Sequence, residues 1–345
     1  MQPSQQRTHL LSNIQLLRAL AALLVLLHHA LPHYTVMGGH SPLIETLSMW
    51  GFLGVDIFFV ISGYIMAYTT FNKPRTSEQA LRFLKHRLVR IYLGYWPFLL
   101  AMALILYIKD SQKLFGLDWA GSFFLTQIDM FKLILPVSWS LSYELYFYLL
   151  FLFTFSVSLK RLYGLIPLFV TFIAGMVLYA ESSPNLQRSF FYSPFLLEFF
   201  SGVLIYMYRS YLMKIWLLPV TFLLMVLAYG YGITYETKNG LLRILTFGVG
   251  ASSLVLFATL LETKRLYRAG KPFTSLGDAS YTLYLSHLII LELFYSTGLR
   301  GLFSSNENPW IPAFGLLSIV LLCIIFSLIY YRRIEKPLYL KAIRY

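Results

Sequence analysis

Arginine and histidine interrupt the first apolar stretch of the sequence, and these residue types can bind anions and move protons. Arg18 and His29 stand eleven residues apart. At about 100° per residue, this spacing places both on one face of a helix, about 16 Å apart along its axis, with His28 about 80° away from Arg18. A neutral imidazole can act as a general base on a hydroxyl group near neutral pH, so we expect His29 to be catalytic. The alternative is a structural arginine and an interfacial histidine.

Carboxyl groups occur in two further apolar segments. Asp56 needs a partner there, and if Arg18 supplies it, Asp56 is structural; the alternative is a direct role. Ser140, Glu144 and Tyr148 share one face at helical spacing, which places a carboxylate between two hydroxyls. Glu144 is therefore either catalytic or one half of a structural pair.

Two polar sets lie in later apolar segments. Ser280, Tyr284 and His287 share a helix face. A lone histidine of this kind is usually a packing group, so we expect His287 to support a site rather than to form one. Glu198 lies beside Gly202, where helices can pack closely, and we expect it to be structural.

A basic segment, residues 82–96, follows the second apolar segment. As a helix it places Arg87 and Arg90 on one face at the membrane surface. The planar forks of these two side chains suit phosphate groups, so we expect them to bind a nucleotide-like donor. For Arg82 and Lys85 we favour the alternative, a topology signal that attracts anionic headgroups.

The elements that position these residues must lie in a membrane. Of the 345 residues, 58% are hydrophobic and 12% charged, whereas soluble domains carry about a quarter charged residues. Ten apolar segments follow one another, most of them close to the roughly 20 residues of a membrane-crossing helix. They are 10–31, 47–70, 91–108, 138–157, 162–180, 190–208, 214–232, 241–261, 278–299 and 310–331. We predict an all-α polytopic membrane protein of about ten transmembrane helices, with no room for an appended soluble domain.

The basic residues are divided unevenly between the two sides of the membrane. With the N-terminus inside, the inner segments hold 20 of the 28 lysines and arginines, and the outer segments hold 7, with Arg243 among the outer ones. Both termini are therefore predicted to be cytoplasmic. The net charge of +13 then records topology, and we expect no nucleic-acid partner. A single cysteine, Cys323, leaves no thiolate cluster, and we expect no metal site.

Seven sequence elements, in this order, resemble acyltransferase family 3, the integral-membrane O-acyltransferases of bacterial surface polysaccharides and exopolysaccharides. The matching elements are Arg18 with His29, Gly54 to Gly63, Arg87 to Ile91, Trp139 through Tyr148, Glu198 through Gly202, Ser280 through His287, and Glu335 through Pro337. They extend over nearly the whole chain, which we expect to be one acyltransferase domain, 1–345. Leu145 and Tyr146 stand where many relatives have a second acid and a glutamine, and the pattern is nearer to the exopolysaccharide-modifying subset.

The resemblance implies a cytoplasmic acyl-CoA donor, most often acetyl-CoA, as co-substrate, with no permanently bound cofactor. It implies an acceptor hydroxyl of a carbohydrate or lipid-linked saccharide at the far side of the bacterial inner membrane. His29 would act as base or as transient acyl carrier, and Arg18 would stabilise the thioester oxygen. The implied roles are catalysis for His29, Arg18 and Glu144, acyl-CoA binding for Arg87, Arg90, Trp139 and Tyr148, and support for Asp56, Ser140, Tyr284 and His287.

The alternative function is that of a transporter or flippase. Its intramembrane arginine, acidic and histidine side chains would then form an ion relay. Such a protein would move a solute or lipid without consuming CoA. A purely structural membrane subunit would not need so many ionisable groups inside the membrane.

Overall fold

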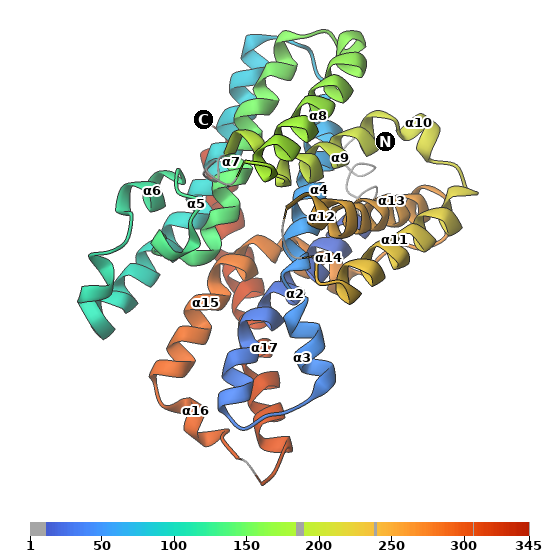
Figure 1. The fold of residues 1–345 in the computed structure, drawn as a ribbon. Helices are drawn as coiled ribbons and strands as arrows, with labels where there is room; N and C mark the ends of the chain where they lie inside the picture. The colour runs from blue at the N-terminus through green and yellow to red at the C-terminus, as the bar shows by residue number, and fades with distance from the viewer. Residues whose placement is uncertain (1–11, 184–189, 238–239, 306, 345) are drawn as a thin grey trace. The chain divides into compact units, whose positions relative to one another are not determined.

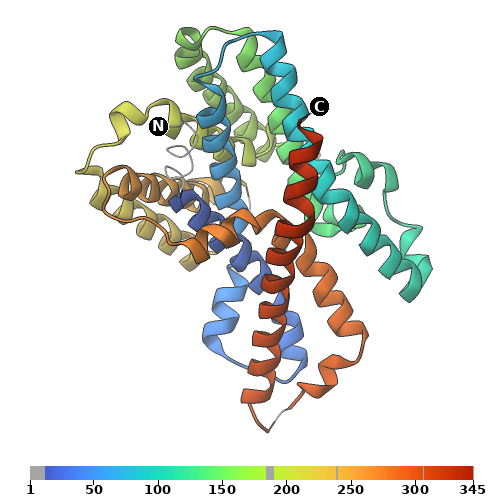
Figure 2. The same ribbon diagram turned by 180° about the vertical axis from the view of Figure 1, so that it is seen from behind.

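The computed structural model describes residues 12–183, 190–237, 240–305 and 307–344, and every regular element in these ranges is helical (Figures 1 and 2). Ten helices correspond to the ten apolar segments, although the first segment was predicted from residue 10, outside the described residues. They are α2 (Ser12–Val36), α4 (Leu53–Thr70), α5 (Ser77–Asp110), α7 (Trp139–Leu152), α8 (Leu159–Glu181), α9 (Phe195–Met207), α11 (Leu217–Thr234), α13 (Val249–Thr263), α15 (Ser280–Ser296) and α17 (Trp310–Tyr330). The predicted all-α membrane fold is confirmed.

Among the described residues, seven helical segments are long and apolar enough to cross a membrane. The helices α7, α9 and α15 have 14, 13 and 17 residues, fewer than the roughly 20 that a perpendicular crossing needs. The count of about ten crossings and the cytoplasmic termini therefore stay predictions.

Shorter helices connect the long ones. They are α3 (Pro42–Met49), η1 (Ser111–Leu114), α6 (Trp119–Phe124), η2 (Met130–Lys132), η3 (Pro136–Ser138), η4 (Phe153–Ser156), η5 (Phe190–Tyr192), α10 (Arg209–Leu212), α12 (Gly240–Arg243), η6 (Ile244–Gly248), α14 (Lys271–Asp278), α16 (Leu299–Leu302), η7 (Tyr331–Glu335) and α18 (Lys336–Ala342). Two of them, η6 and η7, are π-helical turns inside longer helical segments. The stretch 109–137, between the third and fourth apolar segments, consists largely of such short helices.

The chain forms two compact units. The first comprises the described residues within Met1–Arg18, Val55–Leu84 and Tyr146–Thr274. Its helices α4 and α9 approach so closely that a Cβ added to Gly63 would lie 1.8 Å from the carbonyl oxygen of Phe199. A Cβ on Gly202 would lie 1.9 Å from the carbonyl oxygen of Val60. Two glycines therefore allow the two backbones to touch, as small residues do between membrane helices.

The second unit comprises the described residues within Ala19–Gly54, Lys85–Leu145 and Ser275–Tyr345. Helices α15 and α17 lie side by side in it (Figures 1 and 2), and the C-terminal half of α2 packs against both. This contact is an apolar cluster of Ala30, Tyr34, Met37, Leu291, Phe294, Leu316 and Ile319. The hydroxyl of Thr282 on α15 donates to the carboxylate of Glu335 in η7. The packing therefore fixes α15 beside the part of α2 that carries His29.

Candidate functional site

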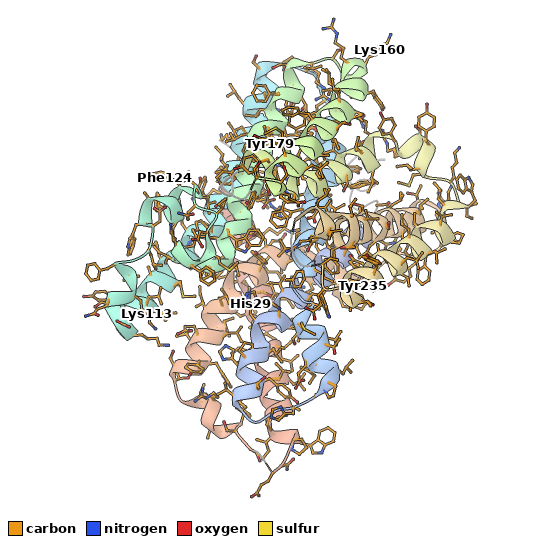
Figure 3. The ribbon with its side chains drawn as sticks, viewed as in Figure 1. His29, Lys113, Phe124, Lys160, Tyr179 and Tyr235 are labelled. Atoms are coloured by element: carbon orange, nitrogen blue, oxygen red, sulfur yellow. The ribbon has the colours of Figure 1, made fainter. Side chains whose placement is uncertain are left out.

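Two histidines from distant parts of the sequence meet inside the second unit. His29 lies on α2 (Figure 3), and His287 lies on α15. Nδ1 of His29 and Nε2 of His287 are 3.3 Å apart, and the ring centroids are 5.0 Å apart. His287 is completely buried, whereas His29 is partly exposed. The fold thus brings His29, the predicted base, into contact with His287, for which the sequence predicted only a supporting role.

Backbone carbonyl groups determine where the two histidines carry their protons. Nδ1 of His29 lies 2.9 Å from the carbonyl oxygen of Val25, and Nδ1 of His287 lies 3.2 Å from that of Leu283. A carbonyl oxygen only accepts, so the hydrogen-bond pattern assigns a hydrogen to each Nδ1. In a neutral imidazole the lone pair is then on Nε2. Nε2 of His29 is therefore the atom that can take a proton, and Nε2 of His287 accepts from Nδ1–H of His29.

His28 is held by a different contact. Its Nδ1 lies 2.7 Å from the carbonyl oxygen of Ser48, at the end of α3. Its ring meets the ring of His29 edge to face, with centroids 5.1 Å apart. This hydrogen bond gives His28 a structural role, because it attaches the segment after α2 to the helix.

Two further predicted residues lie next to the histidine pair. The hydroxyl oxygens of Ser140 and Tyr284 are 2.7 Å apart, and Tyr284 donates to the carbonyl oxygen of Val137 at 2.9 Å. The ring of Tyr284 is 6.1 Å from the ring of His287. Glu144 lies within electrostatic range of the Tyr284 hydroxyl. Ser140, Tyr284 and His287 therefore come together near His29, and Glu144 lies close to them.

Arg18 belongs to the first unit, and helix α2 runs unbroken from it to His29. Its Nη1 lies 3.2 Å from Oε1 of Gln15. The start of the helix is held by the buried carboxylate of Glu262, which accepts from the backbone N–H groups of Ser12 and Asn13 at 3.0 and 2.9 Å. Sequence reasoning missed Glu262; its position directly after an apolar segment is the signal that could have found it.

Asp56 pairs with Arg243, and the expected pair with Arg18 was wrong. Nε and Nη2 of Arg243 lie 2.9 and 2.8 Å from the two carboxylate oxygens. The side chain of Asp56 is 0% exposed and that of Arg243 is 16% exposed. Arg243 lies in the first turn of the helical segment Gly240–Thr263. The bidentate contact uses both oxygens of Asp56 and gives that residue a structural role.

Glu198 lies beside Asp56 in the first unit and is 1% exposed. No described residue donates a hydrogen bond to either of its carboxyl oxygens. The nearby Tyr229 hydroxyl is likewise without a partner among the described residues. The buried polar cluster of Asp56, Arg243, Glu198 and Tyr229 is therefore larger than the sequence indicated.

The residues predicted to bind acyl-CoA lie on two helices. Arg87 and Arg90 are on α5, and both are partly exposed. Trp139 opens α7, and Tyr148, on the same helix, is buried with its ring edge to face with Phe83 at 6.3 Å. The burial of Tyr148 gives it a packing role, and the grouping of the four into one site stays a prediction.

A pocket of about 830 Å³ lies in the first unit between the start of α5 and the end of α7. Arg75, Thr76 and Ser77 line its polar part. The guanidinium of Arg75 donates to the carbonyl oxygen of Thr154 at 3.4 Å and lies over the ring of Phe155 at 5.6 Å. These contacts tie Arg75 to η4, and none of the predicted acyl-CoA residues lines the pocket.

Comparison with protein families matches residues 11–328 to the acyltransferase domain of family 3. The matched range includes His29, His287, Ser140 and Tyr284, and it extends over most of the 345 residues. No curated protein and no solved structure matches the chain. Six of the seven sequence elements lie within the matched range, and Glu335 through Pro337 lies after it. This chain belongs to acyltransferase family 3.

Proposed function

We propose that the protein is a membrane O-acyltransferase that moves an acyl group, acetyl in the first instance, from cytoplasmic acyl-CoA to a hydroxyl group. The proposed acceptor is a carbohydrate or lipid-linked saccharide at the extracytoplasmic side of a bacterial inner membrane. Family membership supports acyl transfer by a membrane protein. The observation that carries the proposal is the state of His29, whose Nδ1–H is bound to Val25 while the lone pair of Nε2 remains available.

In the proposed reaction, Nε2 of His29 takes the proton of the acceptor hydroxyl as that oxygen attacks the thioester carbonyl. A C–O bond forms and the C–S bond breaks. The proton then passes to the CoA thiolate, so that the products are the ester and free CoA thiol. His29 returns to its neutral form and needs no other reagent.

Negative charge develops on the carbonyl oxygen of the thioester during this attack, and a positioned cation or hydrogen-bond donor must stabilise it. Arg18 lies on the same helix as His29, but eleven residues of helix separate the two by about 16 Å, so we assign Arg18 to placing the acyl-CoA donor and not to direct contact with this oxygen. Glu144 is assigned to the surroundings of Tyr284, where its charge can orient the hydroxyl. Arg87 and Arg90 are assigned to the phosphates of CoA, because guanidinium forks suit phosphate oxygens.

The test is acyl transfer from labelled acetyl-CoA by the protein in proteoliposomes, with a membrane saccharide extract as acceptor. His29→Ala should lower transfer by about 100-fold or more, the usual contribution of a general base. His28→Ala is the matched control, because its side chain bonds to Ser48 instead of facing His287, and it should change transfer by less than about threefold.

Near-normal transfer by His29→Ala would contradict the assignment, and equal loss in the two variants would contradict the choice of helix face. Solute or lipid movement in the same vesicles without release of CoA would favour the transporter alternative.

A further inference from the structure

We propose that His287 is a positioning residue that holds the His29 imidazole with its proton on Nδ1 and stabilises the imidazolium formed during transfer. The proposal rests on the proposed function of His29. It starts from the 3.3 Å contact between Nδ1 of His29 and Nε2 of His287.

The direction of this hydrogen bond follows from the surroundings of His287. Its ring is completely buried on α15, and its Nδ1–H is already bound to the carbonyl oxygen of Leu283 at 3.2 Å. A neutral ring with Nδ1 protonated has only a lone pair on Nε2. His287 can therefore accept from His29 but cannot donate to it.

The Nδ1 hydrogen of His29 has two acceptors. The carbonyl oxygen of Val25 lies at 2.9 Å and Nε2 of His287 at 3.3 Å, which is the geometry of a shared, three-centre hydrogen bond. A ring turned by 180° would place a carbon atom where Nδ1 lies and would lose both contacts. The two acceptors together keep Nε2 of His29 directed away from them, as a base on the acceptor hydroxyl requires.

The same contact gains strength when His29 takes the proton. A positively charged imidazolium is a stronger donor, and charge-assisted hydrogen bonds are roughly twice as strong as neutral ones. A neutral nitrogen acceptor adds no charge of its own, so His287 does not fix the proton permanently on His29. The hydrogen bond to His287 therefore stabilises the transition state, in which His29 is protonated, more than the resting state.

His287 can do this because α15 is held in place in the two turns before it. One turn before it, Tyr284 bonds to Ser140 at 2.7 Å and to the carbonyl oxygen of Val137 at 2.9 Å. Below that, Tyr281 donates to the carbonyl oxygen of Ile91 at 2.9 Å. A positioning residue on a rigid helix keeps the geometry that catalysis needs.

The kinetic test compares two substitutions. His287→Phe keeps an aromatic ring of similar size and removes the acceptor, whereas His287→Gln places a side-chain oxygen near the former Nε2. His287→Phe should lower kcat by about 10- to 100-fold with an unchanged KM for acetyl-CoA, because a hydrogen bond to a charged group is lost. His287→Gln should recover most of that loss. A kcat of His287→Phe equal to that of the wild type, or a His287→Gln variant as slow as His287→Phe, would overturn the proposal.

A spectroscopic experiment tests the positioning role without measuring acyl transfer. Solid-state ¹⁵N spectra of histidine-labelled protein in bilayers should show that Nδ1 carries the proton in both His29 and His287. Each signal is assigned by its disappearance from the spectrum of the His29→Ala or the His287→Phe variant. In His287→Phe the His29 signal should change to a mixture of tautomers. An unchanged His29 signal would overturn the positioning role even if the wild type transfers acyl groups, and a wild type without transfer would defeat the proposed function alone.

Discussion

Replacing Arg243 by methionine should destabilise the protein much more than replacing Asp56 by asparagine, although the two side chains form one ion pair. The pair is buried and bidentate, with distances of 2.9 and 2.8 Å. Breaking a buried pair by removing one partner costs about 3–5 kcal/mol of unfolding free energy, because the other charge remains without compensation. Arg243→Met produces this situation, since both Asp56 and Glu198 then lie buried without their cation.

Asp56→Asn differs because Arg243 keeps an acid beside it. Both oxygens of Glu198 lack a donor among the described residues, so this carboxyl group can accept from the guanidinium. The loss should then be about 1–2 kcal/mol, close to that of a single hydrogen bond to a charged group. In Asp56→Asn with Glu198→Gln, Arg243 loses both acids, and the cost should return to about 3–5 kcal/mol.

The measurement is unfolding of the purified protein in mixed micelles, followed by the fluorescence of its six tryptophans. Glu198→Gln alone is the control, and it should cost less than about 1 kcal/mol because Asp56 and Arg243 keep each other. The reasoning is refuted if Asp56→Asn costs as much as Arg243→Met, or if the double variant is no worse than Asp56→Asn.

Two other predictions concern packing and sidedness. Gly63→Ala or Gly202→Ala should sharply reduce the melting temperature and the yield of monodisperse protein, because the added Cβ would meet a backbone carbonyl. Gly164→Ala is the control and should behave as the wild type, because no atom lies within 4 Å of its added Cβ. Equal behaviour of the three variants would contradict the close approach of α4 and α9. In a Cys323→Ala background, an impermeant maleimide should label Lys113→Cys in intact cells and Lys160→Cys only after permeabilisation, since both side chains are exposed (Figure 3) and predicted on opposite sides. The reverse pattern would contradict cytoplasmic termini.

The helices could be predicted from the sequence because each is a continuous apolar run. Every one of the ten apolar segments corresponds to a helix, from α2 to α17. Helical periodicity also related residues within one element, such as Ser140 and Glu144 on α7. Boundaries were less accurate: α5 begins at Ser77, so that the basic segment and the apolar segment after it form one helix of 34 residues.

Contacts between helices could not be predicted in this way. His29 and His287 are 258 residues apart, and Asp56 and Arg243 are 187 residues apart, so no local pattern relates them. Arg243 was only counted among the basic residues of the outer side, since nothing near it in the sequence indicates its partner. Inside the fold Arg243 lies beside Asp56 because a buried carboxylate is stable only with a cation next to it.

The π-helical turn η6, Ile244–Gly248, directly follows Arg243 and has a consequence for the evolution of the family. A π-turn contains one residue more than an α-turn, so its loss would rotate Arg243 by about 100° relative to α13. Ala251 and Val255 on α13 are fully buried and fix the orientation of that helix. The arginine would then turn away from Asp56. In an alignment of relatives, a one-residue gap at this turn should therefore coincide with the loss of the acid or of the arginine.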